Sequence, residues 1–278
     1  MKRNFMCRWL LIVSVIMGGC TREPYQFVDI GTYSLEYQIL GKSKTCFALF
    51  EAGAGFDLET FDPIFKPISQ SCTAIRYSRV GQGKSSKLST QLSSKNYAEI
   101  AKKLLDHLQI EQPVVFVGHS YGGLIARYFA DLYPEHTKAL LLIDPATKWE
   151  GEIIAKIDSN AVENEIKQLK DLGNRIAEER SRSDGLRNEL RDLWLKYPLP
   201  DFADIGDIKV TVLASVQDMG DDLVLGSLEA MQIRANMLES WVNDFPRGRF
   251  VSTTQSGHFI HEEEPELVIA EFQKLLSP

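Results

Sequence analysis

Short apolar runs that do not alternate with polar residues are the feature that most restricts the fold of this 278-residue chain. Runs of this kind suit strands that are buried on both faces of a sheet. Helix-length segments with apolar residues at three- and four-residue spacing separate most of them, as at 97–108 and 124–132. This alternation predicts a mostly parallel sheet with helices on both faces. The runs lie at residues 46–50, 73–77, 114–117, 139–143, 210–214 and 250–253.

Residues 26–40 show a different pattern, because apolar and polar side chains partly alternate there on both sides of Gly31. Such alternation predicts an antiparallel hairpin at the edge of the sheet. No motif repeats at a fixed period along the chain, which argues against a solenoid.

Residues 149–206 interrupt the predicted alternation of strands and helices. The segment is rich in Glu, Lys and Arg, has Ile and Leu at helical spacing, and lies between two of the apolar runs. A helical excursion at this point predicts a cap over the carboxyl edge of the sheet, where open α/β folds place their sites. The alternative is a surface insertion that has no connection with a substrate.

The charge of the chain makes nucleic acid an unsuitable partner. The formal net charge is −7, and the first nineteen residues contribute Lys2, Arg3 and Arg8 without any acid, so removing these three cations leaves −10. An acidic protein repels the phosphate backbone. The overall composition, with 44% hydrophobic and 25% charged residues, is typical of a globular protein.

The N-terminus has the layout of a secretory signal. A basic start precedes an apolar run at 9–17, and two glycines then precede Cys20. This run is much shorter than the roughly 20 residues that a membrane-spanning helix needs. Small residues directly before a cysteine resemble the lipobox of bacterial lipoproteins, which implies that Cys20 becomes lipidated and anchors an exported protein to the cell envelope. The alternative is a signal peptide that is removed near Gly19 and leaves Cys20 unmodified. Residues 1–19 are the expected signal peptide and residues 20–24 a tether.

The motif Gly118-His-Ser120-Tyr-Gly122 stands between an apolar run and a helical pattern. A serine hydroxyl is a weak nucleophile until a base accepts its proton, and it must project from the backbone to reach a carbonyl carbon. A sharp turn from strand to helix exposes it in this way. The turn crowds the main chain, which explains the glycines on either side of Ser120.

In this setting the motif resembles the nucleophile elbow of the α/β-hydrolase superfamily. The resemblance covers most of residues 25–278, with the 149–206 segment unmatched. It implies one compact domain over residues 25–278 with a central, mostly parallel, eight-stranded sheet. Three further segments occur where that family places its site. They are 50–55, with Gly53 and Gly55, 77–85, with Gly81 and Gly83, and 256–259, with Gly257 and His258.

The segment at 50–55 implies an oxyanion hole. The family usually has His and Gly here, followed by the residue whose backbone N–H binds the oxyanion, and Ala52 replaces the His. Because only a backbone N–H is needed, the resemblance assigns this role to Ala54, together with the N–H of Tyr121. The alternative for the two glycines is a tight turn. In the 77–85 segment, Ser78 stands where the family has Asp, and we expect this stretch to shape the wall of the site.

The segment at 256–259 implies that His258 is the catalytic base, because it precedes a Pro-Glu pair and a terminal helix as in the family. An imidazole with a pKa near 6.5 can accept the serine proton and return it to a leaving group. His107, His119, His136 and His261 are the competing histidines. The chain order of serine, acid and histidine favours His258.

Two aspartates compete to be the third member of the triad. Asp218 follows the run at 210–214, at the place where the family has its acid, and is the residue that we expect. Asp144 ends the run at 139–143, where some relatives carry the acid, and is the first alternative. Asp221 and Asp222 are further alternatives. The acid would hold the imidazole in the correct tautomer and stabilise its charged form.

Cys46 and Cys72 are the two cysteines left in the folded body once Cys7 and Cys20 are set aside. Each lies at the start of an apolar run, and the resemblance makes these two strands neighbours. A pair of cysteines in an exported protein is a candidate disulfide. The alternative is two small buried apolar side chains.

These features together predict a serine hydrolase that cleaves an ester-type acyl bond of a small-molecule substrate through an acyl-enzyme. A peptidase, thioesterase, lactonase or carbon–carbon hydrolase would use the same groups. A second hypothesis is a catalytically silent lipoprotein that keeps the fold as a binding module, because Ala52 and Ser78 depart from the family pattern. No metal-binding or nucleotide-binding motif occurs, so we expect no cofactor.

Overall fold

The computed structural model describes residues 25–147, 149–178, 183–195, 205–220 and 223–277. The expected signal peptide, Cys20 and the tether lie outside these residues, as do Asp221 and Asp222. Within the described part of the chain, no helix has both the length and the apolar character that crossing a bilayer requires.

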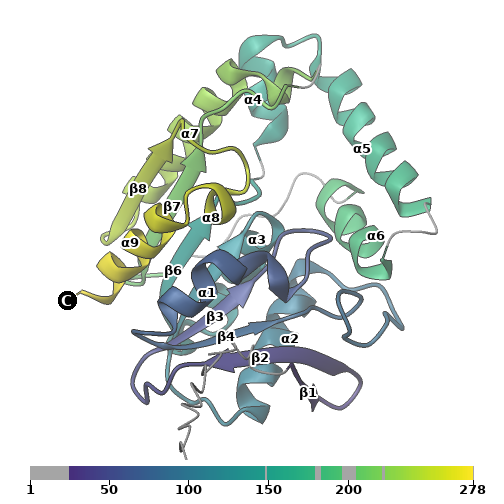
Figure 1. Cartoon of the computed structure of the whole chain (residues 1–278). Coiled ribbons are helices and arrows are strands. Elements are labelled where there is room, and N and C mark those ends of the chain that lie inside the picture. The colour runs from purple at the N-terminus through teal and green to yellow at the C-terminus, as the bar shows by residue number, and fades with distance from the viewer. Residues whose placement is uncertain (1–24, 148, 179–182, 196–204, 221–222, 278) are drawn as a thin grey trace, which may run out of the picture.

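Eight strands form one sheet in the order β1-β2-β4-β3-β5-β6-β7-β8 (Figure 1). The strands are β1 Gln26–Asp29, β2 Ser34–Leu40, β3 Phe47–Glu51, β4 Thr73–Tyr77, β5 Val114–His119, β6 Thr137–Ile143, β7 Lys209–Ser215 and β8 Gly248–Thr253. The pairs β1–β2 and β2–β4 are antiparallel, whereas β3 to β8 pair in parallel. The predicted parallel sheet with an antiparallel hairpin at its edge is therefore confirmed.

Helices cover both faces of the sheet, because successive side chains of each buried strand point to opposite sides. In β5, Val114 and Phe116 join the core beneath α2, α3 and α7, and Val115 and Val117 join the core beneath α1, α8 and α9. Both sets are fully buried, which explains why the strand sequence does not alternate. The helices are α1 Asp62–Ile68, α2 Ser94–His107, α3 Tyr121–Leu132, α7 Leu228–Asn243, α8 Ile260–Glu263 and α9 Pro265–Leu276.

Three more helices, between β6 and β7, occupy the end of the sheet toward which the parallel strands point (Figure 1). They are α4 Glu150–Ile157, α5 Val162–Glu178 and α6 Asp184–Leu190, with a π-helical turn at Arg191–Leu195. Short 3₁₀ turns occur at Leu58–Phe61, Pro134–His136 and Val224–Gly226. We call α4 to α6 the cap helices. Gly185 donates to Gly81 O at 3.2 Å, so α6 rests directly on the loop after β4.

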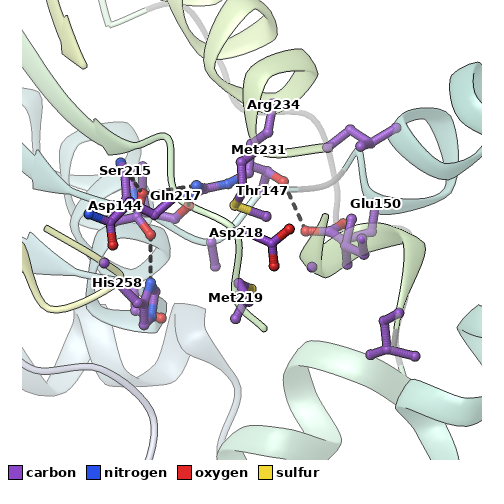
Figure 2. A pocket seen from close by; sticks show the side chains of 18 of the residues that line it. Asp144, Thr147, Glu150, Ser215, Gln217, Asp218, Met219, Met231, Arg234 and His258 are labelled. Carbon is purple, nitrogen blue, oxygen red and sulfur yellow. Dashed lines mark hydrogen bonds and ion pairs between the residues drawn. The ribbon is translucent and has the colours of Figure 1, made fainter. Parts of the chain in front are cut away.

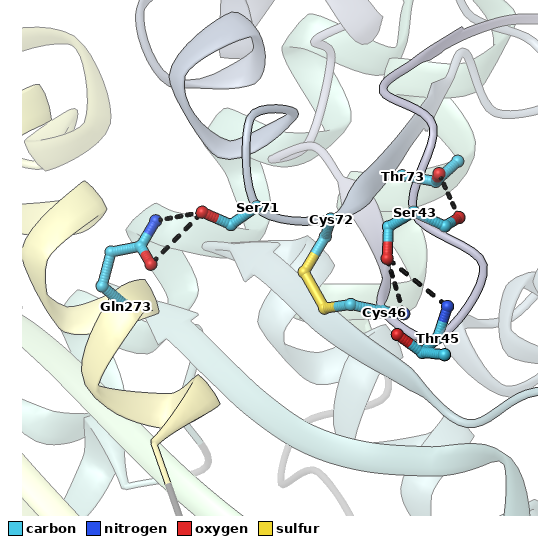
Figure 3. The surroundings of a disulfide bond; sticks show 7 residues. All are labelled: Ser43, Thr45, Cys46, Ser71, Cys72, Thr73 and Gln273. Atoms are coloured by element: carbon cyan, nitrogen blue, oxygen red, sulfur yellow. Dashed lines mark hydrogen bonds between the residues drawn. A yellow bond between two sulfur atoms is a disulfide. The ribbon is translucent and has the colours of Figure 1, made fainter.

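Cys46 and Cys72 are joined in a disulfide just before β3 and β4 (Figure 3). These strands pair in parallel, with Phe47 opposite Thr73, so the two cysteines lie at the same level of the sheet with their Cα atoms 4.7 Å apart. The structure thus has the bridged form of the two alternatives.

Candidate active site

Ser120 occupies a strained turn between β5 and α3. Its φ of +52° lies in the region of positive φ that residues other than glycine rarely adopt. This backbone conformation is expected of a nucleophile elbow. The flanking glycines permit this turn. A Cβ on Gly118 would lie 2.5 Å from Gly122 O, and a Cβ on Gly122 would collide with Glu51 O. The predicted need for glycine at both positions follows from these contacts.

A cavity of about 650 Å³ opens in front of Ser120, between the carboxyl edge of the sheet and the cap helices. Ser120, Asp144 and His258 all line it (Figure 2 shows most of the wall). Most of the remaining wall is apolar and comes from both the core and the cap. The apolar residues are Pro145, Ala146, Ile153, Leu169, Leu172, Leu193, Met219, Leu223, Leu225, Met231 and Phe259.

His258 contacts Asp144, whose Oδ2 lies 2.6 Å from its Nδ1 (Figure 2). Asp144 directly follows β6 and is held from other sides as well. Its Oδ1 accepts from Ser215 N at 2.9 Å and from Arg234 Nη1 at 2.9 Å. Burial by itself raises the pKa of Asp144, but Arg234 and His258 outweigh burial and lower this pKa well below its usual range. Asp144 is therefore an ionised carboxylate that orients the ring of His258.

Asp218, which we expected as the partner of His258, does not contact it. Its side chain is exposed and accepts from Gly220 N at 2.7 Å within its own loop. Figure 2 shows Asp218 in the pocket wall, apart from the pair formed by His258 and Asp144. The expectation is corrected because Asp218 lies three residues beyond the end of β7, whereas Asp144 is adjacent to β6 and in a buried position.

The loop after β3 borders the elbow, as the proposed oxyanion hole requires. A Cβ placed on Gly53 would lie 3.4 Å from Ser120 Cβ. Gly55 has a φ of +82° in a turn that Phe56 N closes onto Gly53 O, so a tight turn and a role for Ala54 are compatible. Tyr121 is the first residue of α3, and backbone N–H groups in the first turn have no partner within the helix.

The competing histidines have other environments. His119 is buried behind the site and its Nε2 lies 2.9 Å from His258 O, and burial lowers its pKa well below the usual range. His261 is also buried, 3.1 Å from Thr60 Oγ1, and burial lowers its pKa to about 3. Both are therefore neutral at physiological pH. His107 is exposed at the end of α2, and His136 lies in a surface turn.

Arg234, Glu150 and Glu263 are charged residues of this pocket that the sequence did not single out. Arg234 of α7 bonds Asp144, and Glu150 at the start of α4 lines the wall. Glu150 accepts from Thr147 Oγ1 at 2.8 Å through Oε1, and burial raises its pKa to about 7. No motif marks Arg234 or Glu150, because each is an ordinary helical residue until the fold turns it inward. Among the described residues, no group of three or more His, Cys, Asp or Glu is arranged to hold a metal ion.

The sequence pattern of the alpha/beta hydrolase fold matches residues 49–204, more than half of the chain. The chain belongs to this family. A curated relative, the uncharacterized protein YqjL of Bacillus subtilis (strain 168), is 30% identical over 98 residues, which are 35% of this chain and 39% of YqjL. The chain thus covers less than half the length of this relative.

Two solved structures show the same fold at low identity. The enol-lactonase from Burkholderia xenovorans LB400 has a TM-score of 0.66 and 15% identity, covering 91% of this chain and 100% of that chain. A thermophilic esterase from Thermogutta terrifontis has a TM-score of 0.63 and 19% identity, covering 88% of this chain and 93% of that chain. At these identities the likeness establishes the fold alone.

Proposed function

We propose that this protein is a serine hydrolase that cleaves carboxylic esters, with Ser120, His258 and Asp144 as its catalytic triad. The observation that carries the proposal is the 2.6 Å contact between His258 Nδ1 and a buried carboxylate, in a pocket that Ser120 also lines. A carboxylate on Nδ1 fixes the tautomer in which Nε2 can accept a proton.

The proposed reaction uses these groups in turn. His258 Nε2 takes the proton of Ser120 as Oγ bonds to the ester carbonyl carbon, and the carbonyl oxygen becomes an oxyanion. The N–H groups of Ala54 and Tyr121 bind this oxyanion. The intermediate expels the alcohol, which receives the proton from His258, and leaves an acyl group on Ser120. Water, deprotonated by His258, then releases the carboxylic acid and restores the serine hydroxyl.

The pocket favours an apolar acyl or alcohol group. Its wall includes Leu, Ile, Met and Phe side chains from both the core and the cap, and burying a side chain of this size against a substrate yields roughly 1.5–3 kcal/mol. Likeness in fold to an esterase and to a lactonase supports an ester-type bond. We therefore propose esters with an aliphatic chain as the substrate class.

A fluorophosphonate probe tests the proposal, because it reacts with an activated serine. The wild-type protein should be labelled, and Ser120→Ala should lose both the label and the hydrolysis of p-nitrophenyl esters. A wild type that binds an ester without labelling or turnover would instead favour the binding-module alternative. Faster turnover of a peptide amide or thioester than of the matched ester would reassign the bond that is cleaved.

The lipid anchor on Cys20 remains a proposal that rests on the sequence pattern of residues 1–20. Replacing Cys20 with Ser should move the protein from the membrane fraction to the soluble fraction of the envelope, since a lipid chain supplies the membrane affinity. Retention of Cys20→Ser in the membrane fraction would argue against lipidation.

A further inference from the structure

A buried ionic cluster lies behind the loop that forms the proposed oxyanion hole. Arg79, in the loop after β4, is 1% exposed and bonds two carboxylates, Glu51 at 2.7 Å and Glu189 at 2.9 Å. Glu51 ends β3 and also accepts from Tyr77 OH, whereas Glu189 belongs to cap helix α6. The cluster therefore joins the sheet, the loop after β4 and the cap.

Side chains of the same cluster form hydrogen bonds to the backbone of residues 52–55. Arg79 Nη1 donates to Ala52 O and Arg79 Nη2 to Gly53 O, both at 2.6 Å. On the other side of the turn, Gly55 N donates to Glu189 Oε2 at 2.7 Å. Arg79 thus binds the two carbonyl groups on the N-terminal side of the turn, and Glu189 binds the N–H group on its C-terminal side.

These bonds fix the orientation of one peptide group in particular. The carbonyl of Gly53 and the N–H of Ala54 belong to the same peptide, and in a trans peptide the two groups point in opposite directions. Holding Gly53 O on Arg79 therefore determines where the Ala54 N–H points. Ala54 N–H is the donor that the proposed function assigns to the oxyanion.

Stability alone does not explain so costly an arrangement. Removing a guanidinium and two carboxylates from water costs several kcal/mol per ion, and apolar replacements of a buried ion pair are often equally stable. Charged groups with several directed hydrogen bonds do, however, hold a backbone more exactly in place than apolar packing does. An oxyanion hole needs this because its donors act only when they are already oriented.

We propose that Arg79 and Glu189 are positioning residues for the oxyanion hole, so that cap helix α6 completes the catalytic machinery. The proposal rests on the proposed esterase function. It assigns the 77–85 segment a task beyond shaping the wall of the site, and it makes the cap part of the reaction. Without Glu189, the turn at 53–56 loses the acceptor of Gly55 N and Arg79 loses one of its two carboxylates.

Glu189→Ala and Glu189→Gln test this proposal, with Glu271→Ala as the matched control. Glu271 is a buried carboxylate of α9 that accepts from Arg249 of β8 at 2.6 Å. It does not line the pocket. Glu189→Ala should lower kcat about 10- to 100-fold with KM within about threefold, the loss expected when catalytic groups are misplaced by about 1 Å. Glu189→Gln, whose amide oxygen can still accept from Gly55 N, should lose less. Glu271→Ala should lower Tm while kcat stays unchanged.

Binding of a trifluoromethyl ketone gives a readout that simple destabilisation does not change. This inhibitor forms an adduct with the serine whose oxyanion needs the hole, so its affinity should fall in Glu189→Ala by the same factor as kcat. Arg79→Lys, which cannot hold both carbonyls, supplies a second variant if Glu189→Ala fails to fold. Folded variants that keep wild-type kcat and inhibitor affinity would overturn the inference. A wild type without esterase activity or fluorophosphonate labelling would overturn the proposed function itself.

Discussion

The loops that follow β6 and β7 start at the same edge of the sheet, and each offers an aspartate to the pocket. Asp144 directly follows β6 and is 3% exposed, with Ser215 N, Arg234 and His258 bonded to its two oxygens. Asp218 is exposed and bonded within its own loop. The two carboxylates follow neighbouring strands, but only Asp144, which is adjacent to its strand, forms hydrogen bonds with residues outside its own loop.

The difference indicates what the acid of the proposed triad needs. A carboxylate must be buried enough that water does not compete for it and bonded enough that it stays ionised there. Asp144 meets both conditions because Arg234 offsets the cost of its burial. Four substitutions would break or sharpen this comparison.

The largest effect should come from Asp144→Asn. An amide keeps the shape of the side chain but stabilises the wrong tautomer of His258, and the corresponding change in a serine protease lowers kcat about 10⁴-fold. We expect a loss of similar size in steady-state hydrolysis of a p-nitrophenyl ester, with thermal unfolding to verify that the variant folds. Activity within tenfold of wild type would remove Asp144 from the triad.

Glu150→Gln should show how burial in the same pocket changes the pKa of a carboxylate that has no cation bonded to it. The folded-state pKa of about 7 lies above the usual 4.5, so the folded state binds this proton more tightly than the unfolded state does. Stability should therefore fall as pH rises from about 4.5 through 7, by at most about 3 kcal/mol. Gln removes this loss, and urea unfolding at pH 5 and pH 8 should show the variant gaining relative to wild type at pH 8. An equal change with pH in both proteins would contradict the prediction.

Arg234→Met removes the cation that keeps Asp144 ionised. The pKa of Asp144 should rise, because burial would then be opposed by His258 and Ser215 N alone. The acid side of the kcat/KM profile should move to higher pH, and kcat near neutral pH should fall about tenfold, which corresponds to about 1.4 kcal/mol. A pH profile that overlays the wild type would show that Arg234 does not support the acid.

Asp218→Asn should have the smallest effect and serves as the matched control for Asp144→Asn. Because Asp218 bonds within its own loop and does not contact His258, we expect kcat within about threefold of wild type, the small change typical of exposed positions. A large loss of kcat in the same ester assay would mean that the β7 loop rearranges to bring Asp218 to the imidazole.

Local patterns of the sequence were enough to predict the sheet and its helices. Strands buried on both faces need unbroken apolar runs, and the six runs became β3 to β8 with ends that differ by at most a few residues. The elbow was predictable for a similar reason, since a turn that brings Gly122 against Glu51 O excludes any side chain there. His258 was expected from the resemblance of residues 256–259 to the closing Gly-His segment of the family, and the structure pairs its ring with Asp144.

The sequence by itself thus determined the order of the elements and the strained turn at Ser120, because each depends on residues that are neighbours along the chain. Tertiary structure alone decided which aspartate meets the imidazole, and brought Arg79, Glu189 and Arg234 to the site. Burial and electrostatic partnership are properties of the folded surroundings. Residues more than a hundred positions apart, such as Arg79 and Glu189, acquire them only once the cap closes over the sheet.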